Sequence, residues 1–277
     1  MAKKELIKVE DENNGLIPLS ETPDYLTTDT QNHLGLEGLS REDFKIPRIK
    51  LLQPLNPEVQ AFPGKAIPGR FWHTGSNIDL GDKFNFIPAI ANRRVILFRP
   101  RDDGGGILAL SRDGRHWDVG ANRTFQVKLK GAPEPIQWFT NKDVQSSHLL
   151  EWGTENPNDP DSGPAAMLIY EYLVYLQDNP EFSPVVMGCF RTALNNARSF
   201  NTSLLMLKRP IQCVSVKASV QYKTENANSW FVPHFELNGY VDQKTFEIVK
   251  NITNKHKEYQ AEYSPEEATV EKESEAF

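Results

Sequence analysis

The sequence has few cysteines, no long apolar run and no hydrophobic segment near its amino terminus, and each absence excludes a class of protein. Cys189 and Cys213 are the only cysteines in 277 residues, which excludes a disulfide-rich scaffold and a cysteine-rich zinc module. No apolar run approaches the roughly 18 residues that a membrane span needs. Residues 1–15 lack the apolar core of a secretory signal. We therefore expect a cytoplasmic protein that makes no membrane contact.

The motifs of common enzyme classes are also missing. The glycine run at residues 104–106 is not followed by Gly-Lys-Ser/Thr, so it predicts a hairpin turn rather than a phosphate-binding loop. None of the six histidines has the spacing to another His or Cys that a zinc site needs. Cys189 as a nucleophile would need a histidine that only the fold could bring close, so we interpret both cysteines as small buried residues. We predict a binding protein with no catalytic residue, no metal and no cofactor.

Charge is distributed unevenly along the chain, whose formal net charge is −6. Residues 1–40 carry three basic and eight acidic residues, and residues 262–277 carry one basic and six acidic residues. Residues 65–130 carry twelve Lys and Arg against six Asp, and residues 186–225 carry six Lys and Arg against one Glu. A basic body between two acidic ends can bind a polyanion although the whole chain is acidic. Ordinary solvated surface is the alternative explanation of the same clusters.

Hydrophobic periodicity predicts many strands and one long helix. The strands are expected at residues 84–87, 93–98, 107–110, 125–129, 167–176, 184–190, 211–222 and 230–241. Residues 191–207 change to spacings of three and four, which predicts an amphipathic helix that Pro210 ends. A short, charged helix or a frayed segment is expected at residues 245–260. Residues 46–52 contain Pro47 and predict an edge strand or packed arm, whereas residues 54–69 predict a loop.

Several strands, then one helix, then two strands is the order of an OB-fold. We therefore predict a mainly β fold with one core helix, an OB-fold-like barrel with long loops and disordered acidic termini. Residues 1–38 are expected to form a flexible acidic arm. Residues 39–261 form a single OB-like β-rich nucleic-acid-binding domain, and residues 262–277 form a disordered acidic tail.

The carboxyl-terminal tail has a pattern that suggests a partner. Glu271, Glu273 and Glu275 lead to a terminal Phe277. A partner can bury the ring of a terminal Phe and pair its α-carboxylate with Arg or Lys. This tail resembles the carboxyl termini of replicative single-stranded DNA-binding proteins of bacteria and tailed phages. Residues 39–53 also look like part of a phage-encoded protein of uncertain annotation.

The resemblance implies an OB-fold that binds single-stranded DNA. It also implies a tail that recruits replication or recombination proteins and, in phage members, competes with DNA for the binding groove. A phage-encoded protein of this kind would work in the cytoplasm of a bacterial host.

The body of the chain contains what such binding needs, because basic side chains hold the backbone of a single strand and aromatic rings stack on its bases. Basic and aromatic residues interleave along the predicted strands. The predicted nucleic-acid-binding residues are Arg70, Trp72, Arg93, Arg94, Arg99, Arg112, Arg115, Trp117, Arg123, Phe125, Lys223 and Trp230. Residues 112–117 are the best candidate for an exposed turn that contacts DNA.

Most rings of a barrel belong to its core. We expect Phe84, Phe86, Tyr170, Phe190 and Phe200 there. Whether Trp72, Trp117, Phe125 and Trp230 are core or exposed is left open by the sequence.

The sequence is thus interpreted as a non-enzymatic, sequence-nonspecific single-stranded DNA-binding protein of phage-type replication or recombination. A homo-oligomer is compatible with it. One alternative is a phage structural or assembly protein, which explains the β content and the tails but not the local basic excess. The other is a metal-dependent DNA-processing enzyme that uses Asp102, Asp103 or Asp113.

Overall fold

The computed structural model describes residue 38 and residues 46–98, 106–118, 124–127, 136–139, 143–156, 159–225 and 228–256, and of residues 124–127 and 136–139 it describes the strands alone. The chain divides into two compact units, Met1–Lys45 and Ile46–Phe277. All helices and strands given below lie in the second unit. The predicted amino-terminal arm and carboxyl-terminal tail lie outside the described residues.

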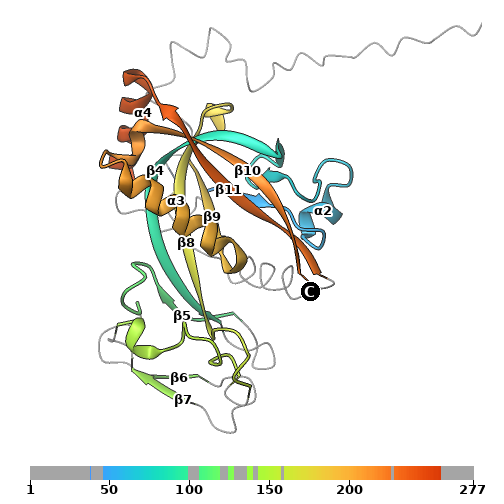
Figure 1. Ribbon diagram of the computed structural model, residues 1–277, viewed down its shortest axis with the longest axis vertical. Coiled ribbons are helices and arrows are strands. Elements are labelled where there is room, and N and C mark those ends of the chain that lie inside the picture. The colour runs from blue at the N-terminus through green and yellow to red at the C-terminus, as the bar shows by residue number, and fades with distance from the viewer. Residues whose placement is uncertain are drawn as a thin grey trace, which may run out of the picture. The chain divides into compact units, whose positions relative to one another are not determined.

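The second unit is built on one nine-stranded sheet that is strongly curled (Figure 1). Its strands are β1 (Arg48–Leu51), β2 (Phe71–His73), β3 (Ile78–Gly81), β4 (Lys83–Phe98), β5 (Ile107–Ser111), β8 (Ala166–Leu176), β9 (Val185–Phe190), β10 (Val214–Glu225) and β11 (Asn228–Tyr240). Their order is β11-β10-β4-β8-β9-β1-β2-β3, and β5 pairs with β4 beside this path. Only the β1–β9 pair is parallel among these described strands. A separate hairpin consists of β6 (Thr124–Val127) and β7 (Ile136–Phe139).

The helices are α2 (Pro57–Ala61), α3 (Leu194–Met206) and α4 (Gln243–Lys255), with short 3-10 turns at η3 (Gln145–Ser147), η4 (Pro180–Phe182), η5 (Arg191–Ala193) and η6 (Ile211–Cys213). The predicted helix at residues 191–207 is therefore confirmed as η5 followed by α3. The predicted charged helix is α4, and the Asp242 carboxylate caps it by accepting a hydrogen bond from the Thr245 N–H at 3.0 Å.

The two long helices cover opposite faces of the sheet. Alternation along β8 sends Tyr172 to one face and Leu173 to the other. Tyr172 joins the main core with Ala197, Phe200 and Leu204 of α3. Leu173 instead packs in a cluster that includes Val249 of α4. A helix on each face therefore shields this part of the sheet from solvent.

The main core buries three of the five aromatic residues that the sequence assigns to the core. Phe84, Phe86 and Phe200 are buried in it. The ring of Phe200 lies 6.2 Å from that of Phe86, edge-on, and 4.9 Å from that of Phe235. Tyr170 and Phe190 are only half-buried, and each packs against the margin of a core cluster.

The strands β4 and β8 are long enough to belong to two parts of the molecule (Figure 1). They pair from Phe86 and Leu176 to Leu97 and Ala166, with a register shift beside Pro88. Pro88 has no N–H for the ladder, so a bulge is expected at that position. The far halves of both strands form a second core with β5 and the segment around η3, and that core contains Trp117. The region between β4 and β8 is thus an extension built on the sheet itself.

A side chain joins the end of β1 to β11. The Nε2 of Gln53 donates a hydrogen bond to the Phe231 carbonyl at 2.9 Å, and the Phe231 N–H donates to the Oε1 of Gln53 at 3.0 Å. This amide reproduces the two hydrogen bonds that a neighbouring strand would make. Gln53 therefore brings the two sides of the curled sheet together at this point.

Two expectations about the amino-terminal half of this unit are wrong, and two of its strands are missing from the prediction. β1 is not an edge strand, because β2 and β9 pair with it on its two sides. Residues 54–69 contain a short helix, α2, rather than loop alone. The strands β2 and β3 are absent from the prediction, since three or four residues are too few to show a clear alternation.

His73 on β2 makes stability depend on pH. It is buried, and the Ser76 N–H donates to its Nδ1 at 3.1 Å, so Nδ1 must be unprotonated. Burial lowers the pKa of His73 from 6.5, although a backbone hydrogen bond at Phe182 acts in the opposite direction. The unfolded chain binds a proton near pH 6.5 and the folded ring resists it, so this stability is present above that pH and is lost as the pH falls below it.

We therefore expect the urea midpoint of the protein to fall between pH 7.5 and pH 5.5, and to fall less in His73→Asn, whose Oδ1 can replace Nδ1 as acceptor. The exposed His148 provides the matched control, His148→Asn, in which the pH dependence should equal that of the wild type. Equal pH dependence in His73→Asn and the wild type would contradict the assignment.

Candidate nucleic-acid interface

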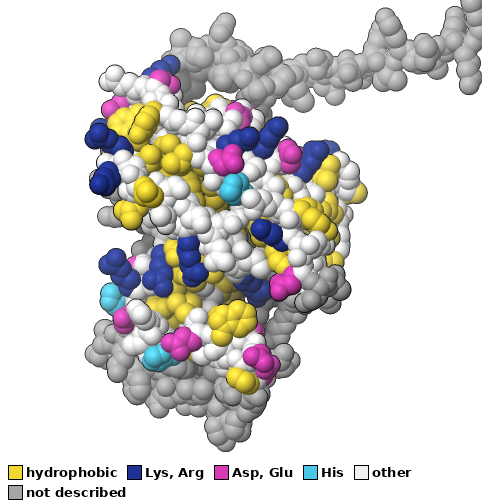
Figure 2. Space-filling view, in the orientation of Figure 1, with side chains coloured by type: hydrophobic (Ala, Val, Ile, Leu, Met, Phe, Trp, Pro, Cys, Tyr) yellow, Lys and Arg dark blue, Asp and Glu magenta, His cyan; other side chains and the backbone are white. Residues whose placement is uncertain are grey.

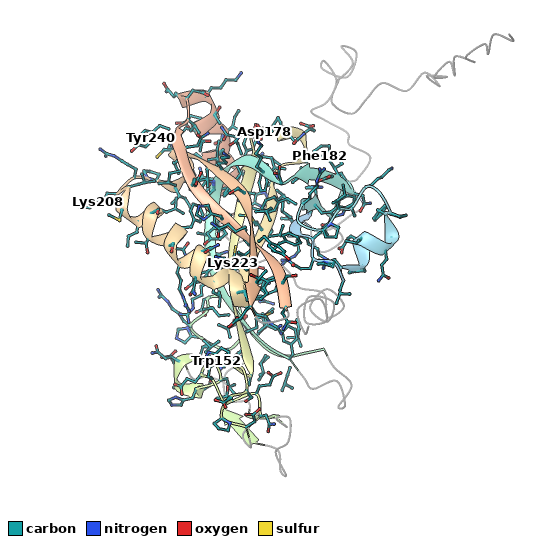
Figure 3. The ribbon with its side chains drawn as sticks, turned by 45° about the vertical axis from the view of Figure 1, so that its right-hand side comes forward. Trp152, Asp178, Phe182, Lys208, Lys223 and Tyr240 are labelled. Atoms are coloured by element: carbon teal, nitrogen blue, oxygen red, sulfur yellow. The ribbon has the colours of Figure 1, made fainter. Side chains whose placement is uncertain are left out.

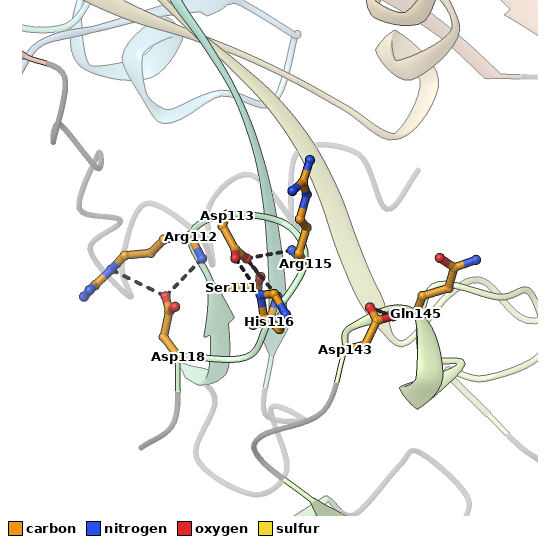
Figure 4. Close-up of polar contacts among 8 residues, drawn as sticks. All are labelled: Ser111, Arg112, Asp113, Arg115, His116, Asp118, Asp143 and Gln145. Atoms are coloured by element: carbon orange, nitrogen blue, oxygen red, sulfur yellow. Dashed lines mark hydrogen bonds and ion pairs between the residues drawn. The ribbon is translucent and has the colours of Figure 1, made fainter. Parts of the chain in front are cut away.

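A turn at residues 112–118, called here the arginine turn, follows β5 and exposes most of its side chains (Figure 4). Asp113 organises it. The Oδ1 of Asp113 accepts hydrogen bonds from the N–H groups of Arg115 at 2.7 Å and His116 at 2.8 Å, and its Oδ2 lies 2.8 Å from the Nδ1 of His116. The backbone of the turn is also tied to the segment before η3, because the Val144 N–H donates to the Arg115 carbonyl. The turn is therefore a fixed scaffold for the side chains beside Asp113.

The protonation state of Asp113 supports this role. Burial alone raises the pKa of Asp113, but hydrogen bonds from His116, Arg115 and Ser111 outweigh it and hold that pKa well below its ordinary value. The carboxylate is therefore ionised throughout the neutral range, and the turn keeps its acceptor.

Three arginines meet at this turn, and we call Arg93, Arg112 and Arg115 the arginine cluster. All three are exposed. Arg93 comes from β4 and crosses the turn at Gly114, where an added Cβ would lie 2.5 Å from the Cγ of Arg93. Gly114 also has a φ of +65°, so the position suits glycine for two reasons. Arg112 is partly neutralised, because its Nε lies 3.6 Å from the carboxylate of Asp118.

The arginine cluster concentrates positive charge on one surface. Within the described part of the chain, Arg93 and Arg115 form no ion pair with an acidic side chain. Figure 2 shows Lys and Arg side chains gathered on this view between the upper and lower parts of the molecule. Exposed guanidinium groups with little local compensation are suited to phosphate oxygens.

The tip of the β10–β11 hairpin presents rings and a lysine. The ring of Tyr222 is 61% exposed and its centroid lies 5.4 Å from that of Phe231. Lys223 is exposed and lies opposite Trp230 in the ladder. Figure 3 shows Lys223 above the part of the molecule that carries Trp152. The hairpin tip, residues 222–231, thus combines a stacking surface with a positive charge.

Sequence reasoning identified Lys223 and Trp230 in this hairpin but missed Tyr222. The alternation of side chains along β10 could have identified Tyr222. Val220 is partly buried against the main core, and Tyr222 lies two residues further along the same face of the strand. Trp230 itself is half-buried, with its Nε1 enclosed.

Two predicted tryptophans are not available for stacking. Trp72 is fully buried with Leu52 and Ala66 under the α2 segment. Trp117 lies within the arginine turn but is buried in the second core, with Val95 and Leu97. Both tryptophans are next to basic residues in the sequence, but this does not determine whether a ring faces solvent or the core. Both rings pack in the core.

Arg94, which was predicted to bind nucleic acid, is not accessible for that role. It is buried, and its Nε lies 3.2 Å from the Oε2 of Glu171. The Oε1 of the same glutamate accepts a hydrogen bond from the Nη2 of Arg48 at 3.1 Å. Arg48, Arg94 and Glu171 therefore form an internal ion-pair network, which we call the buried triad. Arg93 and Arg94 are adjacent on a strand, so one faces solvent and the other faces this network.

The remaining predicted positions divide into two groups. Arg70 is exposed, but it is paired with Asp79 at 2.7 Å, which reduces its value for a phosphate. The other positions lie outside the described residues: Arg99, Arg123, Glu271, Glu273, Glu275 and Phe277, together with the side chain of Phe125.

The carboxylates of the enzyme alternative are placed only in part. Asp102 and Asp103 lie outside the described residues. The carboxylate of Asp113 accepts hydrogen bonds from the backbone of the arginine turn. Among the described residues, no group of three or more His, Cys, Asp or Glu side chains could hold a metal ion. A search of the same residues for a helix long and apolar enough to cross a membrane also finds none.

Comparison with known proteins identifies a family. A family model described as Pam3 phage gp34-like protein matches residues 12–262, which is more than half of the chain. No curated protein and no solved structure matches the chain.

Proposed function

The chain belongs to the Pam3 phage gp34-like protein family, and from that membership together with the geometry above we propose that it is a sequence-nonspecific single-stranded DNA-binding protein of phage replication or recombination. The arginine cluster and the hairpin tip would hold the strand, through its phosphates and its bases respectively. Binding of this kind needs no catalytic group and no cofactor.

The strand order supports an OB-like reading of the sheet. β4 lies between β8 and β10, β8 pairs with β9, β10 pairs with β11, and α3 connects β9 to β10. An OB-fold has five strands with a helix after the third, so this arrangement supports an OB-like fold. The additional strand β1 lies next to β9 and is joined to β11 through Gln53.

The observation that carries the proposal is where the exposed basic and aromatic residues lie on this framework. OB-folds bind oligonucleotides with the face of their second and third strands and with the loops between strands 1–2 and 4–5. In this chain those loops are the extension between β4 and β8 and the β10–β11 hairpin. Arg112 and Arg115 belong to the first, with Arg93 of β4 beside them at Gly114, and Tyr222 with Lys223 belongs to the second.

The acidic tail supports a role in recruitment. A single-stranded DNA-binding protein coats its strand for other enzymes, and residues 262–277 offer them an acidic stretch with the aromatic ring of Phe277. In this proposal the tail recruits replication or recombination proteins and competes with DNA for the basic surface.

The proposal predicts a specific loss when the exposed ring is removed. Tyr222→Ala should weaken binding of oligo-dT by about 1–3 kcal/mol, the usual value of one stacked base. Fluorescence anisotropy of a labelled oligonucleotide measures it. Tyr240→Ala is the matched control, because Tyr240 is 70% exposed at the opposite end of β11. Equal affinities of the two variants would show that the hairpin tip does not stack on DNA.

A further inference from the structure

A pocket opens between β1, β9 and β11, beside the hairpin tip. Its walls include the rings of Phe71, Phe190 and Phe231. Phe231 also contacts the exposed ring of Tyr222, so one side chain belongs both to the pocket wall and to the proposed stacking surface. A strand that stacks on Tyr222 therefore passes the mouth of the pocket.

The charges that line the pocket are already compensated. Lys50 is bound to Glu58 at 2.8 Å, and Arg48 is bound to Glu171 at 3.1 Å. Both ion pairs are largely buried. Either cation could bind a new anion only if its existing pair broke, which would leave a buried carboxylate without its partner. The lining therefore favours an uncharged planar group over a phosphate.

Asn56 supplies a polar group with an unused donor. It lines the pocket and only 5% of its surface is exposed. Its Oδ1 accepts a hydrogen bond from the Gln53 N–H. Among the described residues, none accepts a hydrogen bond from its Nδ2. The Nδ2 is not fully enclosed by protein atoms, so it can donate a hydrogen bond to a carbonyl oxygen of a ligand in the pocket.

We propose that this pocket takes one unstacked base of the bound single strand and that the Nδ2 of Asn56 donates a hydrogen bond to a carbonyl oxygen of that base. This inference rests on the proposed function. Thymine and guanine present such an oxygen at O4 and O6, whereas adenine presents an amino donor at N6. The pocket therefore gives an otherwise nonspecific protein a modest preference for keto bases.

The test compares oligo-dT with oligo-dA on the full chain. Asn56→Asp keeps the oxygen that accepts from Gln53 and replaces the donor by an acceptor. The ratio of the dT affinity to the dA affinity should fall by about fivefold, the usual value of one hydrogen bond. Added negative charge weakens both oligonucleotides alike, so the ratio isolates the pocket. Asn251→Asp, at an exposed position on α4, is the matched control and should leave the ratio at its wild-type value.

A second variant keeps the test decisive if Asn56→Asp does not fold. Thr192 lines the pocket and is exposed, so it lies at the mouth. Thr192→Phe narrows the entrance and should reduce the ratio in the same direction. A folded variant of either kind with the wild-type ratio would overturn the pocket assignment and leave the proposed function standing. Absence of binding to both oligonucleotides by the wild type would instead overturn the proposed function.

Discussion

Replacing the arginine cluster by alanine, Arg93→Ala with Arg112→Ala and Arg115→Ala, is expected to lower the affinity for oligo-dT by about a hundredfold at about 0.1 M salt. Each phosphate that a protein neutralises on a single strand contributes about 0.7 to the slope of log K against log salt. Three lost contacts therefore reduce that slope by about 2. Titrations at several salt concentrations measure both quantities on the same protein.

The control for this variant removes the same charge elsewhere. Arg209, Lys244 and Lys255 are exposed at the end of α3 and on α4, and alanine at these three positions lowers the net charge equally. The account predicts a much smaller change of slope in the control, because a general field is screened over about 10 Å at 0.1 M salt. The same slope in both triple variants would mean that the arginine cluster is ordinary surface.

Glu171→Gln is expected to reduce the free energy of unfolding by about 3–5 kcal/mol, because it removes the carboxylate charge that two buried guanidinium groups share. Glu171 joins Arg48 to Arg94 across three strands of the sheet, and all three side chains are at least nine-tenths buried. The loss is therefore that of a buried network rather than of a surface pair. Urea unfolding monitored by tryptophan fluorescence measures it.

Replacing the whole buried triad provides the comparison. Arg48→Met, Arg94→Met and Glu171→Leu together remove the three charges of the triad at once, and apolar replacements of a buried triad can be neutral or stabilising. The triple variant should therefore be more stable than Glu171→Gln alone. If Glu171→Gln loses no more than about 1 kcal/mol, the network behaves like an exposed ion pair and the buried assignment is wrong.

The sequence predicts the local elements well because each has its own period. β8, β9 and α3 agree with their predicted ranges to within a few residues. The spacings of Ala197, Phe200 and Leu204 place them on one helix face, and that face is the buried one. Alternation and helical period depend on neighbours in the chain, and that is why they can be read without a structure.

The candidate site is harder to predict because burial depends on distant partners. Glu171 lies 123 residues from Arg48 in the sequence, and the residues around Arg48 and Arg94 do not indicate that either pairs with it. The burial of Trp72 and Trp117 could not be predicted for the same reason, because the residues that cover them come from other segments of the chain. Within the predicted turn at residues 112–117, Arg112, Arg115 and His116 are exposed, since Asp-Gly signals a tight turn locally, but Trp117 is buried.

The most direct test is the binding of a labelled oligo-dT of about 30 nucleotides, followed by fluorescence anisotropy at low and moderate salt with double-stranded competitor. The account predicts tight binding that weakens with salt and survives the duplex competitor. A chain that ends at Ala261 should bind as well or better, because the acidic tail no longer competes. No binding at low salt by either the full chain or the shortened one would contradict a single-stranded DNA-binding function.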